Sequence, residues 1–223
     1  MRLRKIKNAA EKLLEFPDLV IQDPHIYNGD LKSIFKNSND LYLEIGMGRG
    51  RFITTHATNN KDINYIGLEL SDSMVLKAAR DIAELNLENL KLLNFDASKL
   101  NEIFKSKSIS KIFLNFSDPW PKTRHAKRRL TYDTFLEMYR DVLIDDGIIE
   151  IKTDNRNLFE FSLIKFNEFG FRFEEVNLNL HEVPNDEIIT TEYEEKFKRL
   201  KNIIYYIKVK KWTLEKEWRS MKT

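Results

Sequence analysis

Three glycines stand within five residues, directly after a largely apolar stretch, and this feature constrains the chain more than any other. Residues 41–46 read as a buried strand that runs into Gly46, Gly48 and Gly50. The whole chain has only seven glycines, so this density is not a matter of composition. Glycine lets a backbone turn tightly and approach a ligand where a Cβ would clash. A strand, a glycine loop and then a helix predict a site for a nucleotide-like ligand in an α/β fold.

The spacing of these glycines distinguishes two classes of ligand. The dinucleotide pattern Gly-x-Gly-x-x-Gly, counted from Gly46, needs its third glycine where Arg51 stands. The chain reads instead Glu-x-Gly-x-Gly-x-Gly, with Glu44 inside the end of the strand. This pattern resembles the first motif of the S-adenosylmethionine-dependent methyltransferases. Their cofactor carries a cationic sulfonium and an ammonium group, so a nearby acid suits it better than it suits a pyrophosphate.

Composition sets the outer limits of the interpretation. A chain of 223 residues with 42% hydrophobic residues predicts one domain, 1–223, with a full core. Within it we expect an N-terminal extension over 1–39 and a C-terminal tail over 213–223. The net charge is +2, so any nucleic-acid surface must be a local patch.

The chain contains no cysteine and four histidines without metal-ligand spacing, so we expect neither a disulfide nor a metal site. The N-terminus is basic but lacks the apolar core of an export signal. No apolar run approaches the ~20 residues that cross a bilayer. We therefore expect a cytoplasmic protein without a membrane partner. No obligate protein partner is inferred, and monomer and homodimer both stay open.

Strand-like and helical segments alternate along the chain. We expect strands over 41–46, 63–70, 90–95, 111–116, 148–152, 171–180 and 203–210. We expect four helices: one after Gly50, one that begins at 71 or 72, one over 135–147 that ends at Gly147, and one from 154 or 155 to Gly170. The alternation predicts an α/β fold: a mostly parallel, twisted sheet of about seven strands with helices on both faces. The last two strands lack an intervening helical stripe, so we expect one antiparallel strand near the C-terminus. Their long connection, 181–202, is a candidate functional loop.

Acidic residues stand at or near the carboxyl ends of successive strands, where open α/β sheets bind ligands. The acids are Glu44, Glu69, Asp96, Asp118 and Asp154. Glu69 is suited to the ribose hydroxyls of an adenosine, and Asp96 to the adenine amino group. Each acid alone could be a solvated loop residue. Glu44, Glu69 and Asp96 together, in register with the glycine loop, favour a cofactor site.

The turn Asp118-Pro119-Trp120-Pro121 follows one of these strands, and its prolines restrict the residues before them to extended backbone. Directly after the turn, five of the eight residues 122–129 are Lys or Arg. Such runs are often solvated faces. This one adjoins the expected site, so it could hold phosphates of a large anionic substrate. We read His125 as a phosphate contact or a spectator. The basic residues Arg2, Arg4, Lys5 and Lys7 could extend that surface, although a solvated terminus explains them more simply.

With these residues in view, the chain resembles the bacterial tRNA (guanine-N7)-methyltransferase family from about residue 40 to about 210. The motifs are Leu-Glu-Ile-Gly-Met-Gly-Arg-Gly, Gly-Leu-Glu, Phe-Ser-Asp-Pro-Trp-Pro-Lys-x-Arg-His, Lys-Arg-Arg-Leu, Lys-Thr-Asp-Asn and Thr-x-Tyr-Glu-x-Lys-Phe. The glycine loop alone indicates a methyltransferase, whereas the Asp-Pro-Trp-Pro-Lys and Thr-x-Tyr-Glu segments are far more specific.

The resemblance implies a Rossmann-like class I methyltransferase fold and methylation of N7 of a guanine at tRNA position 46, in the variable loop. It also implies site residues. S-adenosylmethionine would contact the loop glycines and Glu44, Glu69, Asp96 and Asp118; the substrate would contact Lys122, Asp154, Thr191, Glu192, Tyr193 and Glu194; the RNA would lie against Arg124, His125, Lys127, Arg128 and Arg129.

The chemistry indicates which acid matters most. Guanine N7 has an in-plane lone pair and no proton to lose, so catalysis needs alignment and charge stabilisation more than a strong base. Asp118 is the first candidate for the catalytic carboxylate, and Asp154 is the second. A methyltransferase of another RNA, a nicotinamide-dependent oxidoreductase and a cofactor-free RNA-binding protein stay open as alternatives. The third glycine missing at position 51 argues against the oxidoreductase, and the acids at strand ends argue against the cofactor-free protein.

Overall fold

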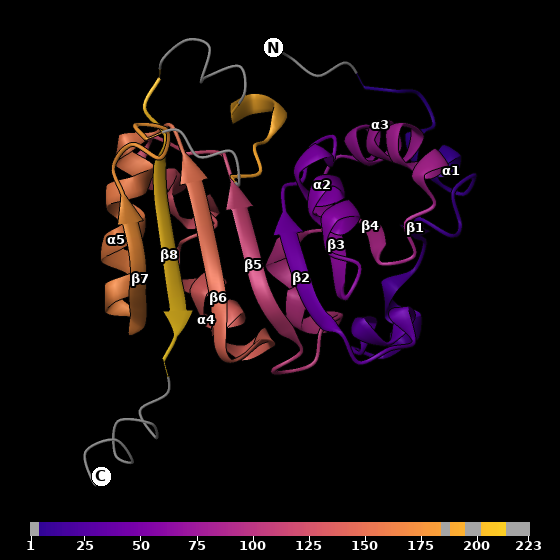
Figure 1. The fold of residues 1–223 in the computed structure, drawn as a ribbon, viewed down its shortest axis with the longest axis horizontal. Coiled ribbons are helices and arrows are strands. Elements are labelled where there is room, and N and C mark those ends of the chain that lie inside the picture. The colour runs from indigo at the N-terminus through magenta and orange to yellow at the C-terminus, as the bar shows by residue number, and fades with distance from the viewer. Residues whose placement is uncertain (1–4, 184–187, 195–201, 213–223) are drawn as a thin grey trace, which may run out of the picture.

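The strands of the protein form one mixed sheet. The computed structural model describes residues 5–183, 188–194 and 202–212. Within these ranges eight strands form a sheet in the order β1-β4-β3-β2-β5-β6-β8-β7 (Figure 1). The strands are β1 Val20–Ile21, β2 Asp40–Ile45, β3 Ile63–Glu69, β4 Leu90–Asn94, β5 Ile109–Asn115, β6 Leu143–Thr153, β7 Phe171–Asn177 and β8 Tyr205–Lys211.

The helices and 3₁₀ turns fill the connections. The α-helices are α1 Ala9–Leu13, α2 Arg51–Asn59, α3 Asp72–Ile82, α4 Asp133–Val142 and α5 Arg156–Glu168. The 3₁₀ helices are η1 Pro24–Tyr27, η2 Leu31–Phe35, η3 Ala83–Leu85, η4 Ala97–Glu102 and η5 Thr123–Arg128. Helix α5 begins where the Asn155 side chain caps it: Asn155 Oδ1 accepts a hydrogen bond from the backbone N–H of Leu158 over 2.9 Å.

The order in which strands are added on the two sides of β2 determines where a ligand site is expected. From β2 the chain adds β3 and β4 on one side, then crosses to β5 and β6 on the other, with parallel pairing throughout. The strand order therefore reverses beside β2, and ligands of open α/β sheets bind at such a switch point. β8 runs antiparallel to both β6 and β7, which confirms the expected antiparallel strand.

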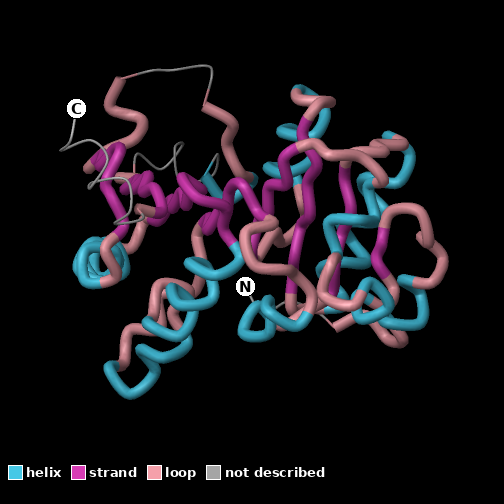
Figure 2. Tube along the Cα trace, turned by 90° about the horizontal axis from the view of Figure 1, so that it is seen from below, coloured by secondary structure: helices cyan, strands magenta, loops and turns pink. Residues whose placement is uncertain are grey.

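Helices lie on both faces of the sheet (Figure 2), and an apolar core lies on each face. Leu41, Leu43 and Ile45 of β2 point into the core shared with α4 and α5. The intervening positions of β2, including Glu44, face the other side, where α1, α2 and α3 pack. Strand alternation thus places the Glu44 carboxylate on the α2 side of the central strand.

Several expected boundaries are wrong in detail. Helix α4 ends at Val142, and β6 already begins at Leu143, so Gly147 lies inside a strand and does not end a helix. A Cβ at Gly147 would come within 2.9 Å of the Ile144 carbonyl oxygen, which explains the glycine by close backbone approach. The eighth strand, β1, was not expected, and β7 ends at Asn177, three residues earlier than predicted.

Some of the residues and segments named in the sequence analysis lie outside the described residues. These are Arg2 and Arg4, much of the 181–202 connection, the end of the Thr-x-Tyr-Glu motif after residue 194, and the tail 213–223. The described part of the N-terminal extension is folded onto the domain. In it α1 packs on α3, and β1 pairs with β4.

Candidate functional site

Two adjoining pockets open at the carboxyl ends of the central strands. The strand-end pocket, about 640 Å³, is lined by Glu69, Asp96 and Asp118 among others. The glycine-loop pocket, about 480 Å³, is lined by Glu44, the three loop glycines and residues 191–193. Both include Gly46, Asn115 and Phe116, so they meet at the switch point beside β2. Each is of the size that small-molecule sites usually have.

The glycine loop takes a backbone shape that side chains rarely allow. Gly46, Gly48 and Gly50 have φ values of 81°, 58° and 76°, all in the left-handed region. Space is also limited, because a Cβ on Gly50 would lie 2.9 Å from the Ile82 side chain. The loop therefore needs glycine both for its turn and for its packing against α3.

Glu44 is a buried carboxylate with one satisfied oxygen. It is 2% exposed, and its Oε1 accepts a hydrogen bond from Asn115 Nδ2 over 2.9 Å. Its Oε2 is buried without a hydrogen-bond donor among the described residues. Burial raises the pKa of Glu44 to about 8, against the lowering effects of the Asn115 bond, the nearby backbone N–H of Ile53 and the Lys152 charge. A cationic group placed in this pocket would offset the cost of the buried charge.

Glu69 and Asp96 line the strand-end pocket and also shape its walls. Glu69 Oε2 accepts from the Gly48 N–H over 3.2 Å, and its Oε1 accepts from the Ser71 N–H over 3.0 Å. Asp96 caps η4, where its Oδ1 accepts from the Ser98 N–H over 2.8 Å. Each carboxylate oxygen has a further lone pair, so both residues can still accept hydrogen bonds from a ligand.

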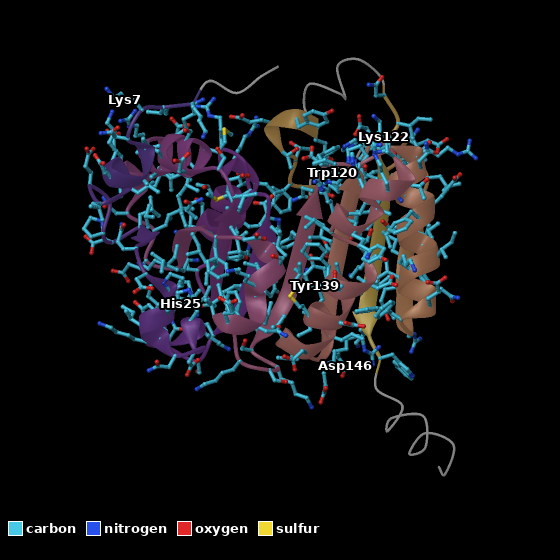
Figure 3. The ribbon with its side chains drawn as sticks, turned by 180° about the vertical axis from the view of Figure 1, so that it is seen from behind. Lys7, His25, Trp120, Lys122, Tyr139 and Asp146 are labelled. Atoms are coloured by element: carbon cyan, nitrogen blue, oxygen red, sulfur yellow. The ribbon has the colours of Figure 1, made fainter. Side chains whose placement is uncertain are left out.

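Asp118 lines the strand-end pocket from a loop of unusual backbone. Phe116 and Trp120, on either side of it, have φ values of 51° and 41°, which bulky residues rarely adopt. Trp120 and Lys122 lie at the end of the sheet where the parallel strands finish, opposite to His25 and Asp146 (Figure 3). Lys122 is exposed and directly precedes η5.

The basic run divides into two kinds of residue. Arg124, Lys127 and Arg128 are exposed, and Arg128 lies over the Trp120 ring at 4.8 Å. His125 meets the edge of the same ring at 5.8 Å between centroids. Arg129, by contrast, donates from Nε to the Pro119 carbonyl and from Nη2 to the Trp120 carbonyl, each over 3.1 Å. Arg129 thus holds the Asp118 loop in shape, a role that sequence reasoning did not assign to it.

The 188–194 segment lies against the glycine-loop pocket. Thr191 and Glu194 form a reciprocal cap: the Glu194 N–H donates to Thr191 Oγ1 over 3.0 Å, and the Thr191 N–H donates to Glu194 Oε2 over 3.2 Å. The Tyr193 ring lies 4.9 Å from the Phe116 ring, and its hydroxyl is 3.5 Å from Asp154 Oδ2, at the outer limit of a hydrogen bond. The fold thereby brings Thr191, Glu192 and Tyr193 to the wall of the glycine-loop pocket, whereas Glu194 lies outside it.

Comparison with known proteins shows the family of the chain. Residues 38–207 match a protein-family model whose description reads "Putative methyltransferase". The tRNA (guanine-N(7)-)-methyltransferase of Bacillus velezensis is 45% identical over 99% of this chain and 98% of its own length. That of Bacillus subtilis is 44% identical, over 99% of this chain and all of its own length. The chain belongs to the tRNA (guanine-N(7)-)-methyltransferase family.

Solved structures confirm the class I methyltransferase fold of this family member. A 16S rRNA (adenine(1408)-N(1))-methyltransferase mutant from Catenulisporales acidiphilia, solved with cosubstrate SAM, superposes with a TM-score of 0.57 at 14% identity, covering 84% of this chain and 91% of that one. The 16S rRNA methyltransferase KamB gives 0.58 at 14% identity, covering 80% and 91%. At such identities the likeness concerns the fold alone.

Three residues of this tRNA (guanine-N(7)-)-methyltransferase family member escaped the sequence analysis: Asn115, Lys152 and His181. Asn115 orients Glu44, whereas Lys152 and His181 both bind the Glu194 carboxylate. A sequence signal existed for Lys152, because a lysine within a buried strand must find a partner. No local signal marks Asn115 or His181, whose partners are distant in sequence.

Among the described residues, no cluster of three or more His, Asp and Glu side chains is arranged to bind a metal ion. Within the same ranges, no helix is both long and apolar enough to cross a membrane.

Proposed function

We propose that this protein methylates N7 of the guanine at tRNA position 46, with S-adenosylmethionine as the methyl donor. One observation carries the proposal: an acid-lined pocket and a glycine-loop pocket meet at the switch point of the sheet, below an aromatic and basic rim. The family membership supports the reaction, and this geometry supports the choice of residues proposed below.

The residues present fit the cofactor. Glu44 presents a buried oxygen without a donor, which a cationic ligand would satisfy. Glu69 and Asp96 would accept from the hydroxyl and amino groups of an adenosine in the strand-end pocket, and the loop glycines allow close backbone approach. When bound, S-adenosylmethionine supplies an electrophilic methyl group. The lone pair of guanine N7 can attack this methyl group without loss of a proton from the base.

Asp118 is our candidate for the catalytic carboxylate. It lines the strand-end pocket, as does Phe116, one of the residues shared with the glycine-loop pocket. A carboxylate there would accept from the guanine N1–H and amino group and stabilise the positive charge that the ring gains on methylation. Asp154, next to the Tyr193 hydroxyl, is the second candidate. Lys122 would hold a phosphate or a base oxygen.

The remaining site residues would hold the tRNA. Thr191, Glu192 and Tyr193 would form a lid over the target base, because all three line the glycine-loop pocket. Glu194 is fully buried outside both pockets, so it would hold the lid in place and would not contact the substrate, contrary to what the resemblance implied. Arg124, His125, Lys127 and Arg128 would contact phosphates. Lys7 lies at the same end of the molecule as Trp120 and Lys122 (Figure 3), so the RNA surface would extend across the rim to the N-terminal segment.

We propose one methyltransferase domain over 1–223, working in the cytoplasm, where tRNA is found. The test is to incubate the protein with unmodified tRNA and isotope-labelled S-adenosylmethionine, and then to analyse the nucleosides by mass spectrometry. Labelled 7-methylguanosine is expected from the natural transcript. A matched transcript with adenine at position 46 should give none. Label in another nucleoside, or equal label in both transcripts, would contradict the proposal.

A further inference from the structure

A buried charge cluster lies beneath the lid, outside the two pockets. The Glu194 side chain is fully buried, and its Oε2 lies 3.1 Å from Lys152 Nζ. Its Oε1 lies 2.7 Å from His181 Nε2. Lys152 Nζ also donates to the Ile189 carbonyl over 2.8 Å. Three separate stretches of the chain therefore converge on one carboxylate.

The cluster favours one position of the lid. A carboxylate removed from water is costly unless several donors satisfy it. Glu194 meets these donors only while the turn at 191–194 occupies its present place, because Lys152 belongs to the sheet. If the turn shifted by an ångström or two, the lysine and the carboxylate would both lose buried partners. The network thus gives the lid a defined resting position.

The same turn carries the groups that face the pocket. Tyr193 packs on Phe116, and Glu192 lies 3.8 Å from Arg49 of the glycine loop. Lys152 Nζ lies 5.4 Å from the centroid of Phe52, which lines the glycine-loop pocket. A displacement of Glu194 would therefore also move the side chains of the turn that form the pocket wall.

We infer that His181 is a positioning residue for methyl transfer: together with Lys152 it holds Glu194, and so fixes the 191–194 turn over the reacting base. His181 does not line either pocket, so it acts through Glu194. The inference deepens the proposed function and rests on it. Misplacement of a positioning group by about 1 Å can cost about 10²-fold in rate, so this interaction is expected to matter.

The test compares two substitutions at His181. His181→Gln keeps an N–H donor near the place of Nε2, whereas His181→Leu removes it. We expect the leucine variant to lose at least about tenfold in single-turnover rate with tRNA and donor saturating, with S-adenosylmethionine affinity within about twofold of wild type. The glutamine variant should recover most of the rate. His25→Leu, at an exposed histidine outside the Glu194 network, is the control for loss of an imidazole and should leave the 191–194 turn as in wild type. Because the His25 ring lies 5.9 Å from the ring of Phe95 in the wall of the strand-end pocket, its rate is also compared with S-adenosylmethionine saturating.

A second measurement does not depend on methylation. The backbone N–H groups of Thr191 and Glu194 are both hydrogen-bonded in the cap, so hydrogen exchange reports whether the turn is held. Exchange at these two amides should be faster in His181→Leu than in His181→Gln or wild type. Unchanged exchange and an unchanged rate in the folded leucine variant would overturn the inference. Equal losses in both folded variants would also overturn it. Changed exchange in a protein inactive on guanine would count against the proposed function alone.

Discussion

Asn115 donates a hydrogen bond to Glu44 across two neighbouring parallel strands, and 71 residues separate the two in sequence. The bond fixes one oxygen of the carboxylate. The other oxygen is buried without a hydrogen-bond partner among the described residues, and Glu44 lines the glycine-loop pocket. Because β2 and β5 meet where the strand order reverses, this pair lies at the centre of the site.

Binding of S-adenosylmethionine should strengthen with pH through Glu44. Burial raises the pKa of Glu44 to about 8, so at pH 6.5 most of the free protein carries a neutral carboxyl group. A cationic ligand favours the ionised form, so the proton must leave on binding, and affinity should rise about tenfold between pH 6.5 and pH 8. Calorimetry across this range measures it. Glu44→Gln is the control for ionisation of the ligand itself, and a pH dependence equal in both proteins would remove Glu44 from the explanation.

Glu69→Ala should weaken S-adenosylmethionine binding by about 1–3 kcal/mol, the loss expected for charge-assisted hydrogen bonds to ribose. The carboxylate also accepts from Gly48 and Ser71, so part of the loss would come from the loop itself. Glu69→Gln can still accept at one oxygen and should lose less. Calorimetry on the three proteins separates these effects, and equal affinity in all three would show that Glu69 does not contact the cofactor.

Neutral replacements at Arg124, Lys127 and Arg128 should weaken tRNA binding and flatten its dependence on salt, because a phosphate that no cation neutralises keeps its counterions when the RNA binds. S-adenosylmethionine affinity should not change. Neutral replacements at Lys105 and Lys107, which are ion-paired elsewhere on the surface, provide the control. A salt slope equal in the triple variant and wild type would mean that the run is only a solvated face.

Arg129 is treated apart from that run because its guanidinium binds the Pro119 and Trp120 carbonyls. Arg129→Ala should disturb the loop that carries Asp118, and so lower the methylation rate by about tenfold or more even when tRNA is saturating. Single-turnover kinetics at rising tRNA concentration test this. A defect that high tRNA concentration abolishes would instead place Arg129 with the phosphate-binding residues.

Asp118→Asn should lower the single-turnover rate by about 10²-fold or more, the scale expected when one electrostatic interaction with the transition state is removed. The amide removes the charge that balances the methylated ring and places N–H donors against those of guanine. The protein should still fold, because Asp118 is exposed at the pocket rim. Both substrates must be saturating, and Asp154→Asn should be assayed beside it. A near-normal rate in the Asp118 variant would transfer the catalytic role to Asp154.

The sequence by itself determined the features that depend on near neighbours. The strand before the glycines, the tight turn at the glycines and the start of a helix at 154 or 155 all follow from local patterns, and the structure has them at Asp40–Ile45, Gly46–Gly50 and Asn155. The alternation that predicts a parallel sheet is also local. The motifs were sufficient to indicate the family, because each is a short run of specific residues. The boundary between α4 and β6 was predicted wrongly, since Gly147 is required by close packing inside a strand and not by a helix end.

Only the tertiary structure decided which side chains meet. No local sequence signal is strong enough to predict three of these contacts. They are the Asn115–Glu44 hydrogen bond, the hydrogen bonds of Arg129 to its own loop, and the binding of Lys152 and His181 to Glu194. The physical reason is that buried polar groups choose partners by position in space, and strand order and loop return set that position. Chain crossing at β2 brings Asn115 to Glu44, and the return of the chain to β8 brings Glu194 to Lys152.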